Sequence, residues 1–178
     1  MSDYARDMAA TATVFGFFAV SWFGWAREDP PHSWQRPLVV LMVAASALCL
    51  AGGVLTWRLW STGTALDAVS APRFGIVVGI EFALAGAGAG VLAALRRAEF
   101  ISAWIAFVVG VHFLPLAAIL DFPALVVPGV AIPVWVVAAV LLARARGVAV
   151  SALAGSGTGA VLLVTGLLSL AAAVAATG

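Results

Sequence analysis

The sequence has very little charge, and this lack excludes an ordinary soluble domain. Charged residues make up 10% of its 178 residues, whereas 64% are hydrophobic. Soluble domains carry charge on roughly a quarter of their residues, so this composition cannot build a water-facing surface around an apolar core. The mean hydropathy of +1.14 instead indicates a protein whose outer surface is solvated by lipid.

Several functional groups are also scarce. The sequence has no lysine, its formal net charge is +1, and Cys49 is its one cysteine. A nucleic-acid partner is not expected, because such partners require a basic patch. An intramolecular disulfide and a multi-cysteine metal site are excluded. One buried histidine without a partner motif does not favour haem, and no metal or other cofactor is expected.

Six apolar stretches are each long enough to cross a bilayer, which takes about 20 residues as a helix. A backbone in lipid must satisfy its own hydrogen bonds, so these stretches are expected to be helices. The sequence therefore predicts an all-α fold, a polytopic membrane helical bundle forming a single domain, residues 1–178. The predicted spans are residues 8–26, 37–57, 74–95, 100–120, 122–143 and 148–176.

Two of these stretches have features that bear on whether and where each forms a helix. The first ends in Trp22 and Trp25 and shows no small-residue cleavage site, so we expect a retained helix and not a cleaved signal peptide. The fifth contains Pro123 and Pro133, and proline in a helix removes a hydrogen bond. This span is expected to be kinked or to begin late, near Leu125.

The arginines are unequally divided between the two sides of the predicted bundle. Linkers 27–36, 96–99 and 144–147 hold six arginines, whereas the opposite side holds three. Cytoplasmic loops carry an excess of basic residues. We therefore expect these linkers in the cytoplasm and both termini outside, in the inner membrane of a bacterium.

Small residues form stripes on two predicted spans. Such stripes let helix backbones approach closely in a membrane. On this basis we expect the third and sixth spans at the centre of the bundle, although glycine- and alanine-rich composition alone also produces such patterns. The stripe of the third span is Gly75, Gly79, Ala83, Gly86 and Gly90, and that of the sixth includes Gly155, Gly159 and Gly166.

Glu81 and His112 are the two strongly polar residues deep within predicted spans. Glu81 precedes Arg96 by 15 residues and His112 follows Glu99 by 13, so both lie about 20 Å from the shared turn. A pair at one depth would share a proton, which lowers the cost of burying either group. Such a pair either handles a proton or ligand, holds two helices in register, or does not form.

Other residues are expected to surround this pair. Pro115 cannot donate a hydrogen bond to the carbonyl of Val111, which leaves an acceptor beside His112. Arg73 and Asp121 are expected at the outer mouth of the same helical hairpin.

Two segments carry a resemblance to a known group of proteins. They are Gly79-Ile80-Glu81-Phe82 and the run Val109-Gly110-Val111-His112-Phe113-Leu114-Pro115-Leu116-Ala117. The chain resembles an uncharacterised group of small bacterial multi-pass membrane proteins with a G-I-E helix followed by a V-G-x-H-F-L-P-L-A helix. The resemblance implies a bacterial membrane location and brings no activity, substrate or cofactor.

Three classes of function remain, and transport is favoured. A small-solute or proton-linked transporter or channel would have a water-accessible cavity that reaches Glu81 and His112. A non-catalytic structural or accessory subunit would leave a small-residue stripe exposed to lipid for another membrane subunit. A membrane-embedded enzyme acting on a lipid or quinone would need more polar residues at the depth of Glu81, and few are present. The lipid bilayer is a partner in every case, whereas the small-molecule ligand is unknown.

Overall fold

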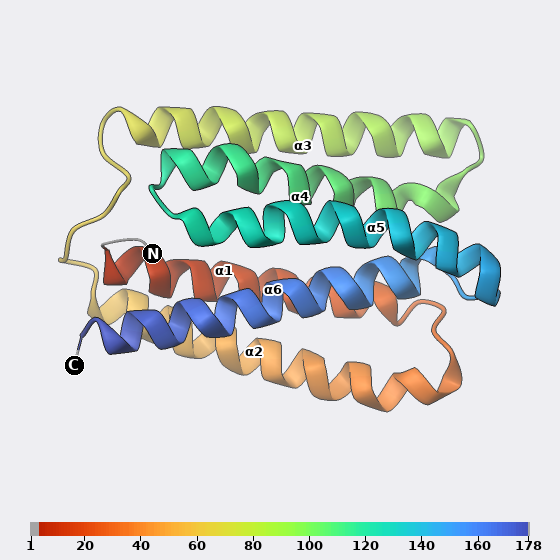
Figure 1. Cartoon of the computed structure of the whole chain (residues 1–178), viewed down its shortest axis with the longest axis horizontal. Coiled ribbons are helices and arrows are strands. Elements are labelled where there is room, and N and C mark those ends of the chain that lie inside the picture. Colours follow the sequence, from red (N-terminus) through yellow and green to blue (C-terminus); the bar gives the residue numbers. More distant parts are fainter. Residues whose placement is uncertain (1–3, 178) are drawn as a thin grey trace.

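The structure is a computed structural model that describes residues 4–177 of the chain, and it is built from helices. Six of them are long and apolar enough to cross a membrane, which confirms the predicted six-helix bundle. They run side by side, and α1 begins at the same end of the bundle at which α6 ends (Figure 1). The helices are α1 (Ala5–Ala26), α2 (Gln35–Arg58), α3 (Ser70–Ala94), α4 (Ile101–Ile119), α5 (Val126–Arg146) and α6 (Val150–Ala175).

The helix ends differ from the predicted spans by up to four residues. The fifth span begins as a short 3-10 turn, Pro123–Leu125, and becomes α-helical at Val126, so it does begin late. The third span begins earlier than expected, at Ser70. Its first turn is stabilised by Asp67, whose carboxylate accepts hydrogen bonds from the backbone N–H groups of Val69 at 2.8 Å and Ser70 at 2.7 Å. A local acceptor of this kind satisfies donors that the helix itself leaves unpaired.

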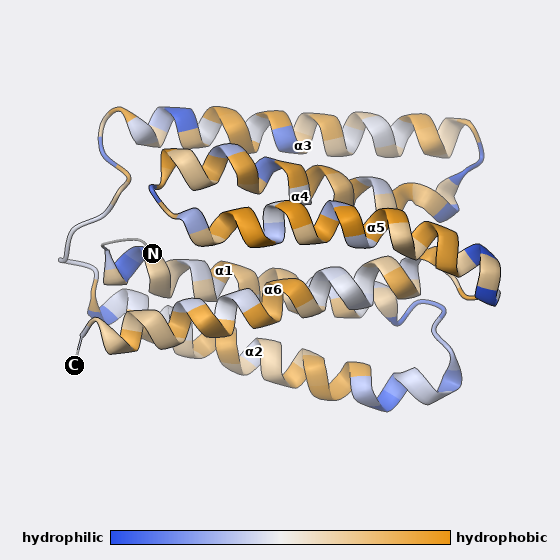
Figure 2. Cartoon of the chain, viewed as in Figure 1, coloured by the Kyte–Doolittle hydropathy of each residue, from blue (hydrophilic) through white to orange (hydrophobic). Residues whose placement is uncertain are grey.

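Charged and apolar residues are separated along the bundle axis. The helices are apolar over most of their length, and the hydrophilic residues gather at the two ends (Figure 2). Large apolar side chains such as Val40, Leu50, Val134 and Leu168 are exposed on the outer faces. In water such a surface would drive association, so lipid is its appropriate solvent. The chain is a multi-pass membrane protein in contact with lipid.

The packed centre of the molecule is α1. It packs most extensively against α6 and α2, while α4 packs against α5 and α3. Phe23 and Met8 of α1 are among the largest fully buried side chains. The expectation that α3 and α6 form the centre is therefore right for α6 and wrong for α3, which lies at one edge beside α4 (Figure 1).

The glycines of α6 permit its close approach to α1. A Cβ on Gly155 would lie 2.6 Å from the backbone oxygen of Trp22, and one on Gly159 would lie 2.7 Å from the ring of Phe23. A Cβ on Gly166 would lie 3.1 Å from the Cβ of Phe15 in α1 and 2.8 Å from the side chain of Leu48 in α2. These distances are shorter than van der Waals contact, so the predicted stripe on α6 is a packing face.

The glycines of α3 have a different environment. A Cβ added at Gly75, Gly79, Gly86 or Gly90 would meet nothing within 4 Å, and Ala83 on the same stripe is exposed. None of the described residues of α3 is buried. The predicted packing role of this stripe is therefore wrong within the single chain. Residue spacing determines which residues share a helix face, but not whether another helix covers that face.

The contact between α3 and α4 uses a different glycine. The indole of Trp104 lies where a Cβ on Gly88 would be, and its Nε1–H donates a 3.0 Å hydrogen bond to the carbonyl of Leu84. That carbonyl belongs to the residue four positions before the glycine, which is the ordinary helical acceptor of the glycine's own N–H. The missing side chain thus gives the indole access to a helix backbone.

The same arrangement joins α5 to α6. The indole of Trp135 occupies the space beside Gly157 and donates a 2.9 Å hydrogen bond to the carbonyl of Leu153, again four residues earlier. Tryptophan in a membrane needs a partner for its N–H, because lipid offers none. Trp104 and Trp135 are therefore interhelical hydrogen-bond donors.

Candidate functional site

Glu81 and His112 face each other between α3 and α4. The Oε2 atom of Glu81 lies 3.5 Å from the Nε2 atom of His112, and their side chains are 13% and 12% exposed. Glu81 lies 11 residues after the first residue of α3, which places it about 16 Å along the helix. The structure therefore brings together the two residues that sequence depth alone placed at one level.

The hydrogen bond of Nδ1 determines which form of the His112 imidazole faces Glu81. Nδ1 of His112 hydrogen-bonds to the backbone carbonyl of Val109, and a carbonyl can only accept, so Nδ1 carries a proton. In a neutral imidazole, Nε2 then presents its lone pair toward Glu81. The pair is thus arranged to hold a single proton, either on the carboxyl group or on Nε2.

The backbone acceptor beside His112 is not the one that the sequence predicted. Pro115 was expected to leave the carbonyl of Val111 available for the imidazole. In the structure Pro115 lies within α4, but the ring bonds to Val109, one helical turn before His112. Because a helical side chain leans toward the N-terminal turn, the carbonyl three residues earlier is within its reach.

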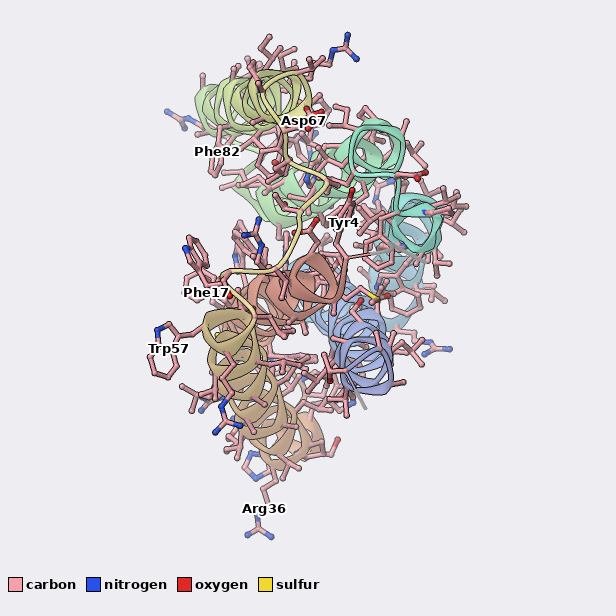
Figure 3. All side chains as sticks on the ribbon, turned by 90° about the vertical axis from the view of Figure 1, so that its left-hand side faces the viewer. Tyr4, Phe17, Arg36, Trp57, Asp67 and Phe82 are labelled. Atoms are coloured by element: carbon pink, nitrogen blue, oxygen red, sulfur yellow. The ribbon has the colours of Figure 1, made fainter. Side chains whose placement is uncertain are left out.

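A cavity of about 660 Å³ adjoins the pair. Its walls come mainly from α1, α3 and α4, and Glu81 and His112 both line it. Val14 and Phe18 of α1 and Phe82 of α3 also line the cavity, and all three are exposed on the outside of the chain. The cavity therefore opens sideways between α1 and α3, toward the lipid. Phe82 lies on the outer side of α3 (Figure 3).

The cavity wall is mainly apolar and rich in aromatic residues. Its aromatic members are Phe15, Phe18, Trp22, Trp25, Phe74, Phe82, Phe113 and Phe122. Trp22 and Trp25 stack on each other with ring centroids 5.4 Å apart. A volume of this size holds a drug-sized molecule, and sites of this kind use a few polar groups to orient an otherwise apolar ligand.

The ionisable groups on the cavity wall are two carboxyl groups and one imidazole. Among the described residues that line the cavity, Asp7, Glu81 and His112 are titratable, and no arginine is present. The histidine faces Glu81. Asp7, in the first turn of α1, was not predicted as a site residue. Asp7 lies one helical turn before Thr11, so the two side chains share the face of α1 that lines the cavity. This spacing is the sequence signal that could have identified Asp7 as a lining residue.

Asp7 ties the segment between α2 and α3 to the end of α1. Its carboxylate accepts hydrogen bonds from the hydroxyl of Thr64 at 2.8 Å and from the backbone N–H of Ala65 at 2.6 Å. Arg6 donates to the carbonyl of Trp60 at 2.8 Å. The next residue of the segment, Leu66, lines the cavity. The segment passes from α2 across the end of α1 to α3 (Figure 3) and so covers that end of the cavity.

Arg73 and Asp121 lie at the same end but do not line the cavity. Their neighbours Phe74 and Phe122 do so instead. Asp121 follows α4 with a positive φ of 47° and is exposed. The predicted polar mouth is therefore not formed by these two side chains. Near the end of a helix, a shift of one residue turns the side chain by about 100° and changes the face on which it lies.

No metal site is formed by the part of the chain that the structure describes. It contains no group of three or more histidine, cysteine, aspartate or glutamate side chains arranged to hold an ion. The candidate site therefore consists of the Glu81–His112 pair and the adjoining cavity.

No protein-family model, curated protein or solved structure matches the chain. The arrangement of Glu81, His112 and the cavity is thus the basis for any conclusion about function.

Proposed function

We propose that this membrane protein is a proton-linked transporter of a small solute, with the cavity as solute site and Glu81–His112 as the proton carrier. The observation that carries the proposal is the contact between the pair and the cavity. Both side chains line a space large enough for a small molecule, and they face each other at 3.5 Å. Ionisable residues inside a membrane are costly and are typically found at transport pathways and proton relays.

The pair supports coupling between a proton and a solute because it has one proton to lose. With that proton, the two side chains together carry no net charge, whichever atom holds it. Without it, Glu81 is left as an uncompensated carboxylate in an apolar cavity, which is unfavourable unless the solute restores the balance. The loss of the proton and the arrival of the solute are therefore expected to occur together.

The small number of contacts that hold α3 in place favours movement of this helix at the site. Among its described residues none is buried, and its polar contacts to α4 are Trp104 with Leu84 and His112 with Glu81. Regions with few buried contacts open at low free-energy cost. A displacement of α3 would change the cavity and the proton pair together, since Glu81 belongs to the helix that moves.

We also propose that the membrane is the inner membrane of a bacterium and that the chain belongs to the group with the G-I-E and V-G-x-H-F-L-P-L-A helices. The linkers 27–36, 96–99 and 144–147 would face the cytoplasm, with both termini outside. Support comes from the arginines, six on one side against three on the other. On this orientation the segment 59–69, which covers one end of the cavity, lies on the outer side.

Reconstitution into liposomes tests the transport proposal. Tetraphenylphosphonium and neutral triphenylphosphine oxide are added separately as trial solutes, and we expect wild-type protein to dissipate an imposed pH gradient faster than protein-free liposomes with at least one of them. Glu81→Gln and His112→Ala should reduce the rate at least tenfold, because each removes one site of the shared proton. Glu99→Gln, on the exposed linker, is the matched control and should retain the wild-type rate.

Flux rates are compared only among variants that are folded. Monodisperse elution in detergent and unchanged helicity establish that each variant is folded. Rates that equal those of protein-free liposomes for the wild type, or that are the same in all four proteins, contradict the proposal.

An accessory-subunit function is the second candidate, because the glycine face of α3 is open. A Cβ on Gly75, Gly79, Gly86 or Gly90 would meet nothing within 4 Å, and of these four only Gly86 also lines the cavity. Small-residue stripes mediate helix association in membranes, so a helix of another subunit would fit here. Gly79→Val would then release a co-purifying subunit and leave proton flux in liposomes unaffected.

A further inference from the structure

We infer that the transported solute is a lipophilic monocation, which reaches the cavity from the bilayer and replaces the proton held between Glu81 and His112. This inference rests on the proposed transport function and deepens it by naming the solute's chemical class.

The sign of the charge follows from the ionisable groups on the cavity wall. The described lining residues include the carboxyl groups of Asp7 and Glu81, and no arginine. Arg6 approaches Asp7 at 3.7 Å, but it is directed to Trp60 and does not line the cavity. An anion would find no fixed positive charge except a protonated His112, which is already paired with Glu81. A cation would find a carboxylate.

The aromatic rings favour the same charge. Eight of the 25 residues that line the cavity are phenylalanine or tryptophan. The faces of these rings carry partial negative charge and attract cations, most strongly when the cation is poorly hydrated. Quaternary ammonium and phosphonium ions are of this kind, whereas a small hydrated metal ion would have to lose its water to an apolar wall.

The lipophilic character follows from the way into the cavity. Val14, Phe18 and Phe82 line the cavity and are also exposed on the outer surface. Leu66 and its segment cover the end near α1. A solute that partitions into the bilayer can therefore enter between α1 and α3 without crossing that covered end.

Electroneutrality connects cation binding to proton release. The protonated pair is neutral overall, and the deprotonated pair with one bound monocation is neutral as well. The bilayer interior disfavours any state with unbalanced charge. Thus a monovalent cation replaces one proton, whereas a neutral solute of similar shape would leave the carboxylate uncompensated.

Three titratable groups bear on the pH dependence of binding. They are Glu81 on α3, His112 on α4, which packs against it, and Asp7 on α1 across the cavity. Asp7 is already engaged by Thr64 and Ala65. We therefore expect Glu81 and His112 to dominate, and cation affinity to rise as pH rises, because the cation competes with their proton.

Equilibrium binding in detergent tests the inference separately from transport. Tetraphenylphosphonium binding is followed by the intrinsic tryptophan fluorescence of the protein, to which Trp22 and Trp25 of the cavity wall contribute. The neutral probe is triphenylphosphine oxide. We expect saturable cation binding that strengthens at least threefold from pH 6 to pH 8, and at least tenfold weaker binding of the neutral probe. Glu81→Gln should weaken cation binding at least tenfold, while Glu99→Gln should leave it unchanged.

The possible results distinguish this inference from the transport proposal. Saturable, Glu81-dependent cation binding without proton-linked flux in liposomes would support the cation site and contradict the transport function. Proton-linked flux with triphenylphosphine oxide, but no saturable cation binding, would support transport and overturn the cation inference. Equal affinity for both probes, or cation binding unchanged by Glu81→Gln, would also overturn it.

Discussion

The helices α6 and α3 have a similar apolar, glycine-rich composition and opposite roles in the structure. Both are long and apolar, and each carries a stripe of glycines at helical spacing. Twelve residues of α6 are buried, whereas none of the described residues of α3 is. Glycines let α6 pack against the backbone of α1, but the α3 stripe meets no part of the chain.

This difference separates a fixed frame from a wall that is able to move. Together, α1, α2 and α6 form the frame, because close backbone contact gives many small van der Waals attractions that act collectively. The outer wall, α3, carries Glu81 on the face that it turns toward α4 and the cavity. The acidic group of the site thus belongs to the least buried helix, which is where movement costs least.

The largest expected difference in stability between the two helices comes from adding a side chain to the glycine stripe of each. Gly155→Val would force the side chain into the backbone of Trp22 and Ala26, which lie 2.6 and 2.9 Å from the new Cβ. Overpacking of this kind costs about 1–3 kcal/mol. Gly79→Val places the same side chain in open space, so we expect a change within about 0.5 kcal/mol.

Thermal unfolding in detergent, followed by circular dichroism, measures both substitutions. We expect a clearly lower Tm for Gly155→Val and an unchanged Tm for Gly79→Val. Similar losses in the two variants would mean that α3 is packed as tightly as α6, and the distinction between frame and wall would be wrong.

A smaller effect is expected from acid at the start of α3. Hydrogen bonds from the backbone N–H of Ser70, and also from its hydroxyl and from Val69, lower the pKa of Asp67 below its usual value. A carboxyl group with a lowered pKa stabilises the folded state above its unfolded-state pKa, and this contribution is lost as pH falls through the lowered value. The first turn of α3 should therefore loosen below about pH 4.

Amide hydrogen exchange as a function of pH tests this effect after correction for the intrinsic rates. Protection of residues 69–72 is expected to fall in acid, whereas the first turn of α6, which lacks an acidic residue, should change less. Asp67→Asn should abolish the pH dependence of protection. A parallel loss at both helix starts would indicate global unfolding and would contradict a local role for Asp67.

The six-helix fold could be predicted from the sequence because lipid imposes simple rules on composition. Long apolar stretches must be helices, and the turns must hold the charges, so the six spans were predictable to within a few residues. The meeting of Glu81 and His112 was predictable in depth, since both were counted from one tight turn. Helix rise alone is enough for such an estimate.

The remaining features depend on side-chain direction and on tertiary packing, which one sequence does not determine. The open glycine face of α3 and the packed face of α6 have the same spacing. The hydrogen bonds of Trp104 and Trp135 require a particular glycine on a neighbouring helix. The contact of Asp7 with Thr64 joins residues 57 positions apart, through a segment without periodic structure.

Proton release on cation binding tests the central claim most directly. Purified protein in weakly buffered detergent at pH 7 is titrated with tetraphenylphosphonium while a pH indicator reports the protons set free. We expect about one proton per bound cation in the wild type and in Glu99→Gln. We expect almost none in Glu81→Gln. Saturable binding without proton release, or equal release from Glu81→Gln, would contradict the claim that Glu81 and His112 hold an exchangeable proton at the cavity.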